Sequence, residues 1–192
     1  MDLDTIEQIK NGDKEAFKEL YDEYKEKVYK TTCMMVNDGA VAEDLVQEIF
    51  INIYLKIHKL NYYEALNSWI YKITINSCMK YLKKNNKIKY SEDEDAINYI
   101  KESNPSLIPE QKLVANEFNR EVMKYIYELS DSQRICILLF YYNQMSIKEI
   151  AAIMECSENT IKSRLFMGKK NLKGKLKKIG ECEMEVTLDG LK

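Results

Sequence analysis

Glycine and proline are scarce in this sequence, which has 6 glycines and 2 prolines among 192 residues. Tight turns depend heavily on these two residue types, so we expect few of them. Isoleucine, leucine, lysine, glutamate and tyrosine are abundant instead, and this balance favours an all-α protein. A chain of this length has room for one large domain or two small ones.

The sequence also lacks the histidines and closely spaced cysteines of a zinc site. His58 is the single histidine, and the five cysteines are far apart, with no C-x-x-C pair. Because no group of residues has zinc-ligand spacing, we predict no metal site, and we expect free thiols in a reducing cytosol. The cysteines are Cys33, Cys78, Cys136, Cys156 and Cys182.

No stretch has the residues of a catalytic centre. The sequence contains no glycine-rich phosphate loop and no arrangement of a nucleophile with a histidine. We therefore predict that the protein is not an enzyme, that it has no catalytic residues and that it uses no cofactor.

Long hydrophobic runs are absent as well. No apolar run approaches the roughly twenty residues that a helix needs to cross a bilayer. The first residues, MDLDTIEQIKNGD, are acidic and have no apolar core, unlike a signal peptide. We expect a soluble, cytoplasmic protein with no membrane insertion.

Charge is unevenly distributed along the chain, although its net value is only −2. Residues 69–90 contain six lysines and no acid, and residues 156–180 contain eight basic residues against Glu158 alone. The first sixty residues are acidic in balance. Two basic patches on an otherwise acidic chain fit a protein that meets nucleic acid at two places and protein elsewhere.

Hydrophobic periodicity in the first half of the chain predicts helices with enough apolar faces to close a three-helix bundle. Asp13 is suited to cap a long helix, because an aspartate at this position accepts a hydrogen bond from the first turn. The expected elements are a short helix at 4–10, a long helix from Asp13 to a break at 37–39, helices at 40–60 and 66–84, and a connecting loop at 61–67.

The periodicity fails between Asn85 and Pro109, where the sequence is acidic and contains both prolines. This composition is typical of a flexible linker. Helices are expected again at 110–129 and 131–142, the second opened by a capping box of Ser130 and Gln133. The predicted architecture is a three-helix domain at 1–86, an acidic flexible linker at 87–109, a helix-turn-helix domain at 110–180 and a loosely ordered tail at 181–192.

The stretch 145–178 has the pattern of a helix-turn-helix. Ser146 and Glu149 form a capping box in front of a short helix, and Ser157 is suited to cap a second one. Gly168 in that second helix costs about 1 kcal/mol relative to alanine, so we expect either close packing or a bend there. The expected inward residues are Ile161, Leu165, Leu172 and Leu176, and the outward ones are Lys162, Arg164, Lys169, Lys170 and Lys173.

Such a pair of helices can place the second helix in the major groove of DNA, with a polar first turn toward the bases and a basic face toward the phosphates. The alternative is an ordinary helical hairpin with a solvated lysine face.

Four motifs follow one another along the chain: AFKELYDEY at 16–24, AEDLVQEIFINIY at 42–54, NSWIYKITINSCMKYLKK at 67–84, and EIA at 149–151 with TIKSRL at 160–165. Together they resemble a bacterial extracytoplasmic-function (ECF) sigma factor, the two-domain minimal form of the transcription initiation subunit. The resemblance covers roughly residues 13–178. It implies an alternative sigma factor of RNA polymerase that directs promoter recognition and transcription initiation in response to a signal.

The resemblance also implies a docking face. Asp44, Gln47 and Glu48 match the D-x-x-Q-E-x-F pattern of the family's polymerase-clamp helix. Their spacing of three and four residues puts them on one face of that helix, where we expect them to meet the clamp coiled coil of core RNA polymerase. A solvated helix face without a partner is the alternative.

Both basic patches are expected to bind promoter DNA. Loop 61–67 resembles the family's base-capturing loop, and single strands are held by cationic grooves with aromatic side chains. The expected residues for the downstream element are Asn61, Tyr62, Tyr63, Asn67, Tyr71, Lys72, Asn76, Lys80, Lys83 and Lys84. Those for the upstream element are Ser157, Glu158, Asn159, Thr160, Lys162, Ser163, Arg164, Phe166, Lys169 and Lys170.

The resemblance further implies contact with the polymerase flap, regulation by an anti-sigma factor, and a monomer outside the holoenzyme. One rival interpretation is a free-standing helix-turn-helix regulator with an N-terminal sensing or dimerisation domain, which would bind duplex DNA tightly as a symmetric dimer. A second rival is an interaction protein that mimics a sigma domain and occupies polymerase without directing transcription.

Overall fold

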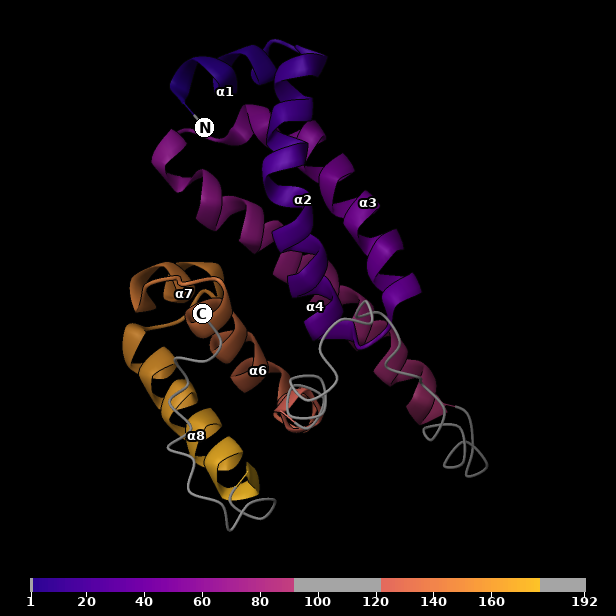
Figure 1. Ribbon diagram of the computed structural model, residues 1–192, viewed down its shortest axis with the longest axis vertical. Coiled ribbons are helices and arrows are strands. Elements are labelled where there is room, and N and C mark those ends of the chain that lie inside the picture. The colour runs from indigo at the N-terminus through magenta and orange to yellow at the C-terminus, as the bar shows by residue number, and fades with distance from the viewer. Residues whose placement is uncertain (1, 92–121, 177–192) are drawn as a thin grey trace, which may run out of the picture. The chain divides into compact units, whose positions relative to one another are not determined.

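The computed structural model describes residues 2–91 and 122–176 (Figure 1). Every regular element in these two ranges is helical, which confirms the predicted all-α class. The chain forms two compact units. We call residues 2–91 the N-terminal unit and residues 122–176 the C-terminal unit.

Aspartates open the first helices of the N-terminal unit, which are α1 (Leu3–Lys10), α2 (Lys14–Val36) and α3 (Gly39–Lys56). Asp13 Oδ1 accepts hydrogen bonds from the backbone N–H groups of the first turn of α2, at 2.9 and 3.1 Å. Asn37 ends α2 in the left-handed conformation, with φ of 57°, a role in which asparagine is tolerated. The predicted cap and the predicted break are therefore confirmed.

The connection from α3 to the next helix is more ordered than an open loop. Two short 3₁₀ turns, η1 (Ile57–Lys59) and η2 (Tyr63–Ala65), flank the exposed residues 61 and 62. Helix α4 (Leu66–Ser91) then runs seven residues past the predicted end at Lys84. Residues 85–91 contain neither proline nor glycine, so nothing in the sequence stops the helix there. The predicted end of this helix at Lys84 was wrong.

Helices α2, α3 and α4 pack against one another in pairs, and α1 packs on α2 and η1 (Figure 1). The core of this bundle consists of completely buried aliphatic side chains, for example Leu20 and Val28 from α2, Ile49 and Ile53 from α3, and Ile70 from α4. This packing fixes the rotation of each helix, so each functional group described below has a defined place on the surface or in the core.

The C-terminal unit begins with a helical segment at 122–127 and continues into α6 (Asp131–Ile137). Ser130 is the N-cap of α6, but its side chain makes no capping hydrogen bond, so the predicted capping box with Gln133 was wrong. The side chain of Gln133 is turned elsewhere: its Oε1 accepts a hydrogen bond from Asn171 Nδ2 at 3.4 Å.

The last turn of the predicted helix 131–142 is a π-helix, η4 (Leu138–Tyr142). Its wider spacing shows in the hydrogen bond from Asn143 N to Leu138 O, at 3.0 Å. Gln144 then takes a φ of 56° and directs the chain into the next helix. A regular α-helix was expected over this segment, and the π turn was missed because it has no distinct apolar period.

Helices α7 (Ile147–Ile153) and α8 (Glu158–Leu176) form the helix-turn-helix. The predicted capping box of α7 is confirmed: Glu149 N donates to Ser146 Oγ at 3.2 Å, and Ser146 N donates to Glu149 Oε2 at 2.9 Å. Both α7 and α6 pack on α8. The predicted inward residues Ile161, Leu165 and Leu172 are buried, whereas Leu176 is only partly buried.

Gly168 lies where α8 packs on α6. A Cβ atom at this position would lie 3.1 Å from Cγ1 and 3.3 Å from Cδ1 of Ile137. These distances are tighter than ordinary van der Waals contact, so the glycine lets two helices approach closely. Of the two expectations for Gly168, close packing is therefore the correct one.

Most of the predicted linker, helix 110–129 up to residue 121, and the predicted tail 181–192 lie outside the described residues. Within the described ranges, Cys33, Cys78, Cys136 and Cys156 are free thiols, as predicted. None of the helices in these ranges combines the length and the apolar character that a membrane span requires.

Candidate nucleic-acid interface

An acidic ridge lies along the exposed side of α3. Asp44, Gln47 and Glu48 are all exposed, while the neighbouring Leu45 and Ile49 are buried. No hydrogen bond or ion pair with another described residue engages the three side chains. Two carboxylates and an amide that are free in this way form a hydrogen-bonding face suited to a basic partner.

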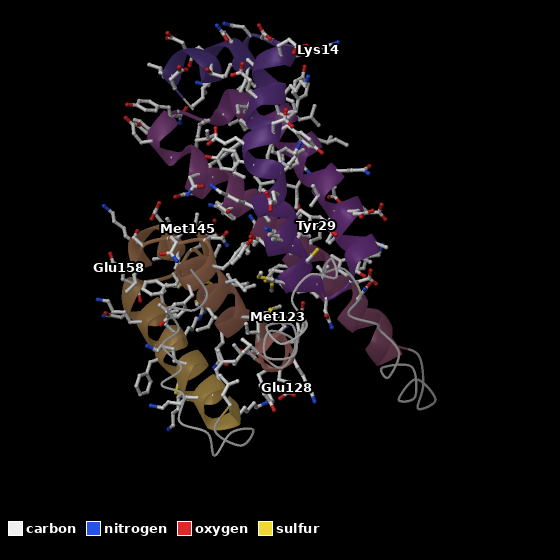
Figure 2. The ribbon with its side chains drawn as sticks, in the orientation of Figure 1. Lys14, Tyr29, Met123, Glu128, Met145 and Glu158 are labelled. Carbon is white, nitrogen blue, oxygen red and sulfur yellow. The ribbon has the colours of Figure 1, made fainter. Side chains whose placement is uncertain are left out.

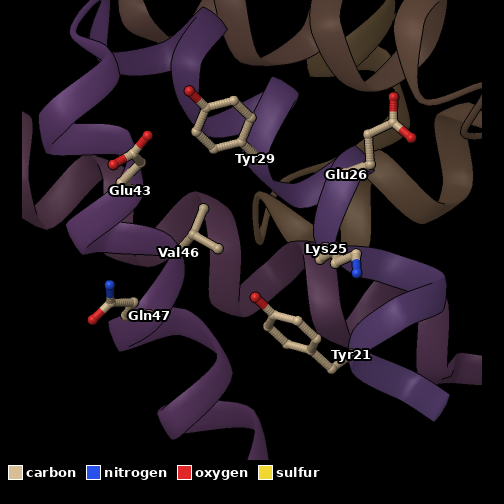
Figure 3. Close-up of a pocket in the computed structure, with 7 residues that line it drawn as sticks. All are labelled: Tyr21, Lys25, Glu26, Tyr29, Glu43, Val46 and Gln47. Carbon is tan, nitrogen blue, oxygen red and sulfur yellow. The ribbon is translucent and has the colours of Figure 1, made fainter. Parts of the chain in front are cut away.

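An open hollow lies between α2 and α3, beside this ridge (Figure 3). Its lining combines Gln47 from the ridge with Tyr29 and charged side chains. A hydrogen bond with Cys33, together with partial burial, raises the pKa of the Tyr29 hydroxyl to about 12, so the phenol stays neutral at physiological pH. The full lining is Tyr21, Lys25, Glu26, Tyr29, Glu43, Val46 and Gln47.

Two exposed apolar side chains continue the ridge toward the end of α3. Ile51 is 59% exposed and Leu55 is 60% exposed. They follow Glu48 by three and seven residues, so they lie on the same helix face. Neither residue was predicted as a site residue, because the apolar period of this helix picks out only its buried stripe. The sequence did contain a sign of this apolar surface, because both residues are aliphatic and lie off the buried stripe.

The loop before α4 exposes the side chains predicted to capture bases. Asn61, Tyr62 and Tyr63 are all exposed, and Tyr62 is 73% exposed. Tyr62 is therefore not a partly buried tyrosine with only its hydroxyl at the surface. An aromatic face of this size open to solvent can stack on an unpaired base.

Helix α4 has one cationic side. Asn76, Lys80, Lys83 and Lys84 are exposed and recur at helical spacing, so they form one stripe. Asn67 and Lys72 are partly buried and lie nearer the start of the helix. No acidic residue falls within α4 up to Ser91, so the stripe keeps its positive potential.

Tyr71 does not belong to this surface. It was expected on the outer face of α4, but it is 2% exposed and is among the largest buried side chains of the core. Tyr71 and Lys80 are nine residues apart, which is about two and a half turns of helix, so the two side chains lie on opposite faces. The prediction of Tyr71 as a DNA contact at the outer face was wrong.

The first turn of α8 is polar and capped by its own hydroxyl groups. Ser157 Oγ accepts a hydrogen bond from Thr160 N at 3.2 Å and lies 2.9 Å from Thr160 Oγ1. Glu158 and Asn159 are exposed at the start of the helix (Figure 2). The Ser157 and Thr160 hydroxyls are therefore occupied by the cap, whereas Glu158 and Asn159 are open to a partner.

The exposed side of α8 displays several of the predicted DNA contacts together. Phe166 is 66% exposed, and Lys169 Nζ lies 5.8 Å from the centre of the Tyr141 ring, within the range of a cation–π contact. The residues exposed on this side are Lys162, Ser163, Phe166, Lys169, Lys170 and Lys173.

Arg164 differs from its basic neighbours. It was predicted to point outward, but it is only partly exposed. Its Nη1 lies 3.8 Å from Met154 Sδ and 3.7 Å from Cys156 Sγ, so the guanidinium packs over the turn between α7 and α8. The aliphatic period of α8 could not reveal this, because the contact involves side chains outside the helix.

Comparison with protein families matches both units. A model described as sigma-70 region 2 matches residues 20–88, and a model described as sigma-70 region 4 matches residues 119–172. The first range contains the acidic ridge and the cationic stripe of α4, and the second contains the helix-turn-helix.

Curated relatives match nearly the full length. The sequence is 31% identical over 176 residues to the ECF RNA polymerase sigma-E factor of Escherichia coli (strain K12), a match that covers 89% of this chain and 92% of that protein. It is 29% identical over 177 residues to the ECF RNA polymerase sigma factor SigW of Bacillus subtilis, covering 90% of this chain and 95% of that protein.

Solved structures share the fold. The sigma factor RpoE of Bartonella quintana, in complex with the anti-sigma factor NepR, has a TM-score of 0.70 at 24% identity, over 84% of this chain and 96% of that chain. CnrH in complex with the cytosolic domain of CnrY has a TM-score of 0.66 at 16% identity, over 92% of this chain and 97% of that one.

Proposed function

The chain belongs to the extracytoplasmic-function sigma factors of RNA polymerase, and from this premise we propose that its two units divide promoter recognition between them. The protein is an alternative sigma factor, a non-enzymatic subunit of transcription initiation. The N-terminal unit docks on core polymerase and holds the melted downstream element. The C-terminal unit binds the upstream element as duplex.

Docking is assigned to α3. The observation that most strongly supports this is the acidic ridge of Asp44, Gln47 and Glu48, whose side chains are exposed and have no partner within the described residues. A basic clamp helix of polymerase would supply the missing partners and steer the encounter. Ile51 and Leu55 extend the same face and would add apolar contact, which interfaces place at their centre.

Melting of the downstream element is assigned to the loop before α4 and to the cationic stripe of α4. Tyr62 and Tyr63 offer aromatic faces to unstacked bases, and base–aromatic stacking is worth about 1–3 kcal/mol per base. Lys80, Lys83 and Lys84 lie on α4 at helical spacing and attract the phosphates without reading sequence. Tyr71 has no part in this role.

Upstream recognition is assigned to α8. Glu158, Asn159 and Lys162 lie in its first turns, where a recognition helix contacts base edges. Lys169 and Lys170 lie about two turns beyond Lys162, where they would contact phosphate. Arg164 acts differently from its neighbours: it holds the turn in front of α8 and so orients the helix.

The proposal is tested by transcription in vitro with core polymerase, the full chain and sheared genomic DNA of its source. Discrete transcripts that require both proteins are expected. Asp44→Arg with Glu48→Arg should reduce them about a hundredfold or more, because charge reversal at the centre of an interface costs several kcal/mol. Binding of core polymerase, measured by mobility or fluorescence anisotropy, should fall in parallel.

Glu15→Arg with Glu19→Arg is the matched control, because it makes the same change of charge at the same spacing on α2, at two other exposed positions. This variant should keep full activity. Transcripts that survive the α3 reversal, or that disappear equally in the control, would refute the assignment of the docking face. Tight operator binding without polymerase would favour the free-standing regulator instead.

We also propose an anti-sigma factor as a partner of this chain. The support is the complex of the similar sigma factor RpoE of Bartonella quintana with the anti-sigma factor NepR. Such a partner would cover the exposed faces of α3 and α8. The tagged chain, purified from its source under unstressed growth, should carry a second protein in equal amount. Removing that protein should allow the chain to bind core polymerase.

A further inference from the structure

Three sulfur-bearing side chains lie around Arg164, where α6 packs near the turn of the helix-turn-helix. The Cys136 thiol donates a hydrogen bond to Met154 Sδ at 3.4 Å. Met154 Sδ and Cys156 Sγ both contact one nitrogen, Nη1 of Arg164, at 3.8 and 3.7 Å. We call Cys136, Met154 and Cys156 the three-sulfur group. Its members come from α6, from the end of α7 and from the turn before α8.

The backbone of the turn explains why two of the sulfurs point the same way. Glu155 has a φ of 51°, a left-handed conformation that non-glycine residues rarely adopt. Met154 and Cys156 flank this residue, and both side chains reach the guanidinium of Arg164. Cys156 is partly exposed while Cys136 is fully buried, so the group has one side open to solvent.

We propose that the three-sulfur group is a binding site for a soft, thiophilic monovalent metal ion of the copper(I) class. Thiolate and thioether ligands select Cu(I) over harder cations. A metal–thiolate bond of about 2.3 Å places the sulfurs of a three-coordinate ion about 4 Å apart, close to the 3.4 Å between Cys136 Sγ and Met154 Sδ.

The ligand set selects against zinc and the hard cations. Structural zinc sites use four ligands, mostly thiolate and imidazole, and calcium and magnesium require oxygen ligands. In the part of the chain that the structure describes, no three histidine, cysteine, aspartate or glutamate side chains are grouped to hold a metal. The present group reaches three donors only because a methionine thioether is one of them.

The charge balance of the occupied site is favourable. Binding releases one proton from each thiol to the solvent, which leaves two thiolates, one monovalent ion and the Arg164 guanidinium. These charges sum to zero, and a buried site strongly disfavours an unbalanced charge.

An ion in this site would join α6 to the turn in front of the recognition helix. Ligand that binds only the folded state stabilises that state by mass action. The C-terminal unit would therefore unfold at higher temperature when loaded, and the N-terminal unit would not respond. The geometry of α8 would also become fixed through the same turn that Arg164 contacts.

The experiment uses the full chain in the background Cys33→Ser, Cys78→Ala and Cys182→Ser, which removes the other thiols. Cu(I) is supplied without oxygen and buffered by a competing chromophoric chelator. One ion per chain is expected, with X-ray absorption showing sulfur-only coordination at about 2.3 Å. Zn(II) supplied in the same way should bind far more weakly, and Zn(II) binding of equal strength would overturn the proposal.

Single variants locate the site. Cys136→Ala and Cys156→Ser should each weaken Cu(I) binding about a hundredfold, and Met154→Leu about tenfold, in line with the cost of losing a ligand or its support. Met167→Leu, at an exposed methionine of α8, is the matched control and should bind normally. Met154→Leu conserves volume and should keep native circular dichroism. Unchanged Cu(I) affinity in that folded variant would overturn the three-sulfur site.

Discussion

The two units present their functional groups on scaffolds of different kinds. In the N-terminal unit, α2, α3 and α4 are long helices around one shared core, and two of them carry separate surfaces, an acidic ridge on α3 and a cationic stripe on α4. In the C-terminal unit a single helix, α8, displays the exposed contacts, and its position depends on close packing at Gly168. Substitutions in the first unit should therefore separate its functions, whereas packing changes in the second should weaken all of its contacts together.

The largest difference between the units should appear with partly melted promoters. Tyr62→Ala with Tyr63→Ala should reduce open complexes on a duplex promoter about a hundredfold, since stacking contributes about 1–3 kcal/mol per base. A template with the downstream element already unpaired should recover most of the loss. Permanganate footprinting of unpaired thymines measures this.

Tyr71→Phe is the control for that experiment, because Tyr71 is buried in the core. Its open complexes should match those of the parent chain. A double tyrosine variant that stays defective on the unpaired template would show that the loop acts before melting, which contradicts its proposed role.

A smaller effect is expected from the recognition helix. Lys162→Glu should weaken upstream-element binding about tenfold, within the 1–3 kcal/mol or so of a base or phosphate contact. Unpairing the downstream element should not recover this loss, because α8 binds duplex. Lys173→Glu, at an exposed position further along α8, should have a weaker effect in the same transcription assay. If the unpaired template restored transcription by the Lys162→Glu variant, the proposed division between a melting unit and a duplex-binding unit would be contradicted.

The two described glycines of α8 should respond to substitution with opposite signs. Gly174→Ala should stabilise the C-terminal unit by up to about 1 kcal/mol, because alanine favours helix and a Cβ there meets no atom within 4 Å. Gly168→Val should destabilise it by about 1–3 kcal/mol through overpacking against Ile137. Urea unfolding followed by circular dichroism measures both, and a stable Gly168→Val would contradict the close approach of α6 and α8.

The smallest effect concerns the order in which the units unfold. Burial raises the pKa of the Cys78 thiol to about 12 and that of the Cys136 thiol to about 11. At pH 8 both therefore lack the reactive thiolate in the folded state and regain it on unfolding. Alkylation at increasing urea, mapped by mass spectrometry, should label Cys136 at a lower urea concentration than Cys78, because the smaller unit buries a smaller share of its surface. Simultaneous labelling would indicate that the units unfold as one.

Sequence patterns predicted the helices of the N-terminal unit well because caps and breaks are local. Asp13 and Asn37 act within one turn of their own positions, so no tertiary contact is needed to recognise them. The end of α4 was placed too early because the hydrophobic period fails after Lys84, although residues 85–91 contain no proline or glycine.

The misses at the candidate site have a common physical cause. Tyr71 was placed on the outer face of α4 with the other candidate DNA contacts of its motif, yet the packing of α4 in the bundle buries it. Arg164 was placed outside by its charge, but its guanidinium is drawn over sulfur atoms of the turn. Ser130 failed to cap with Gln133 because Asn171 of α8 engages that glutamine. Each outcome depends on packing or on a contact with side chains outside the residue's own helix.

Site-specific photo-crosslinking tests the division of the promoter most directly. A photoreactive amino acid is placed at position 62 in one protein and at position 162 in another, each assembled with core polymerase on a promoter found by transcription in vitro. The account predicts that position 62 crosslinks to the non-template strand of the downstream element and that position 162 crosslinks to the upstream duplex. Crosslinks from both positions to one element would contradict it.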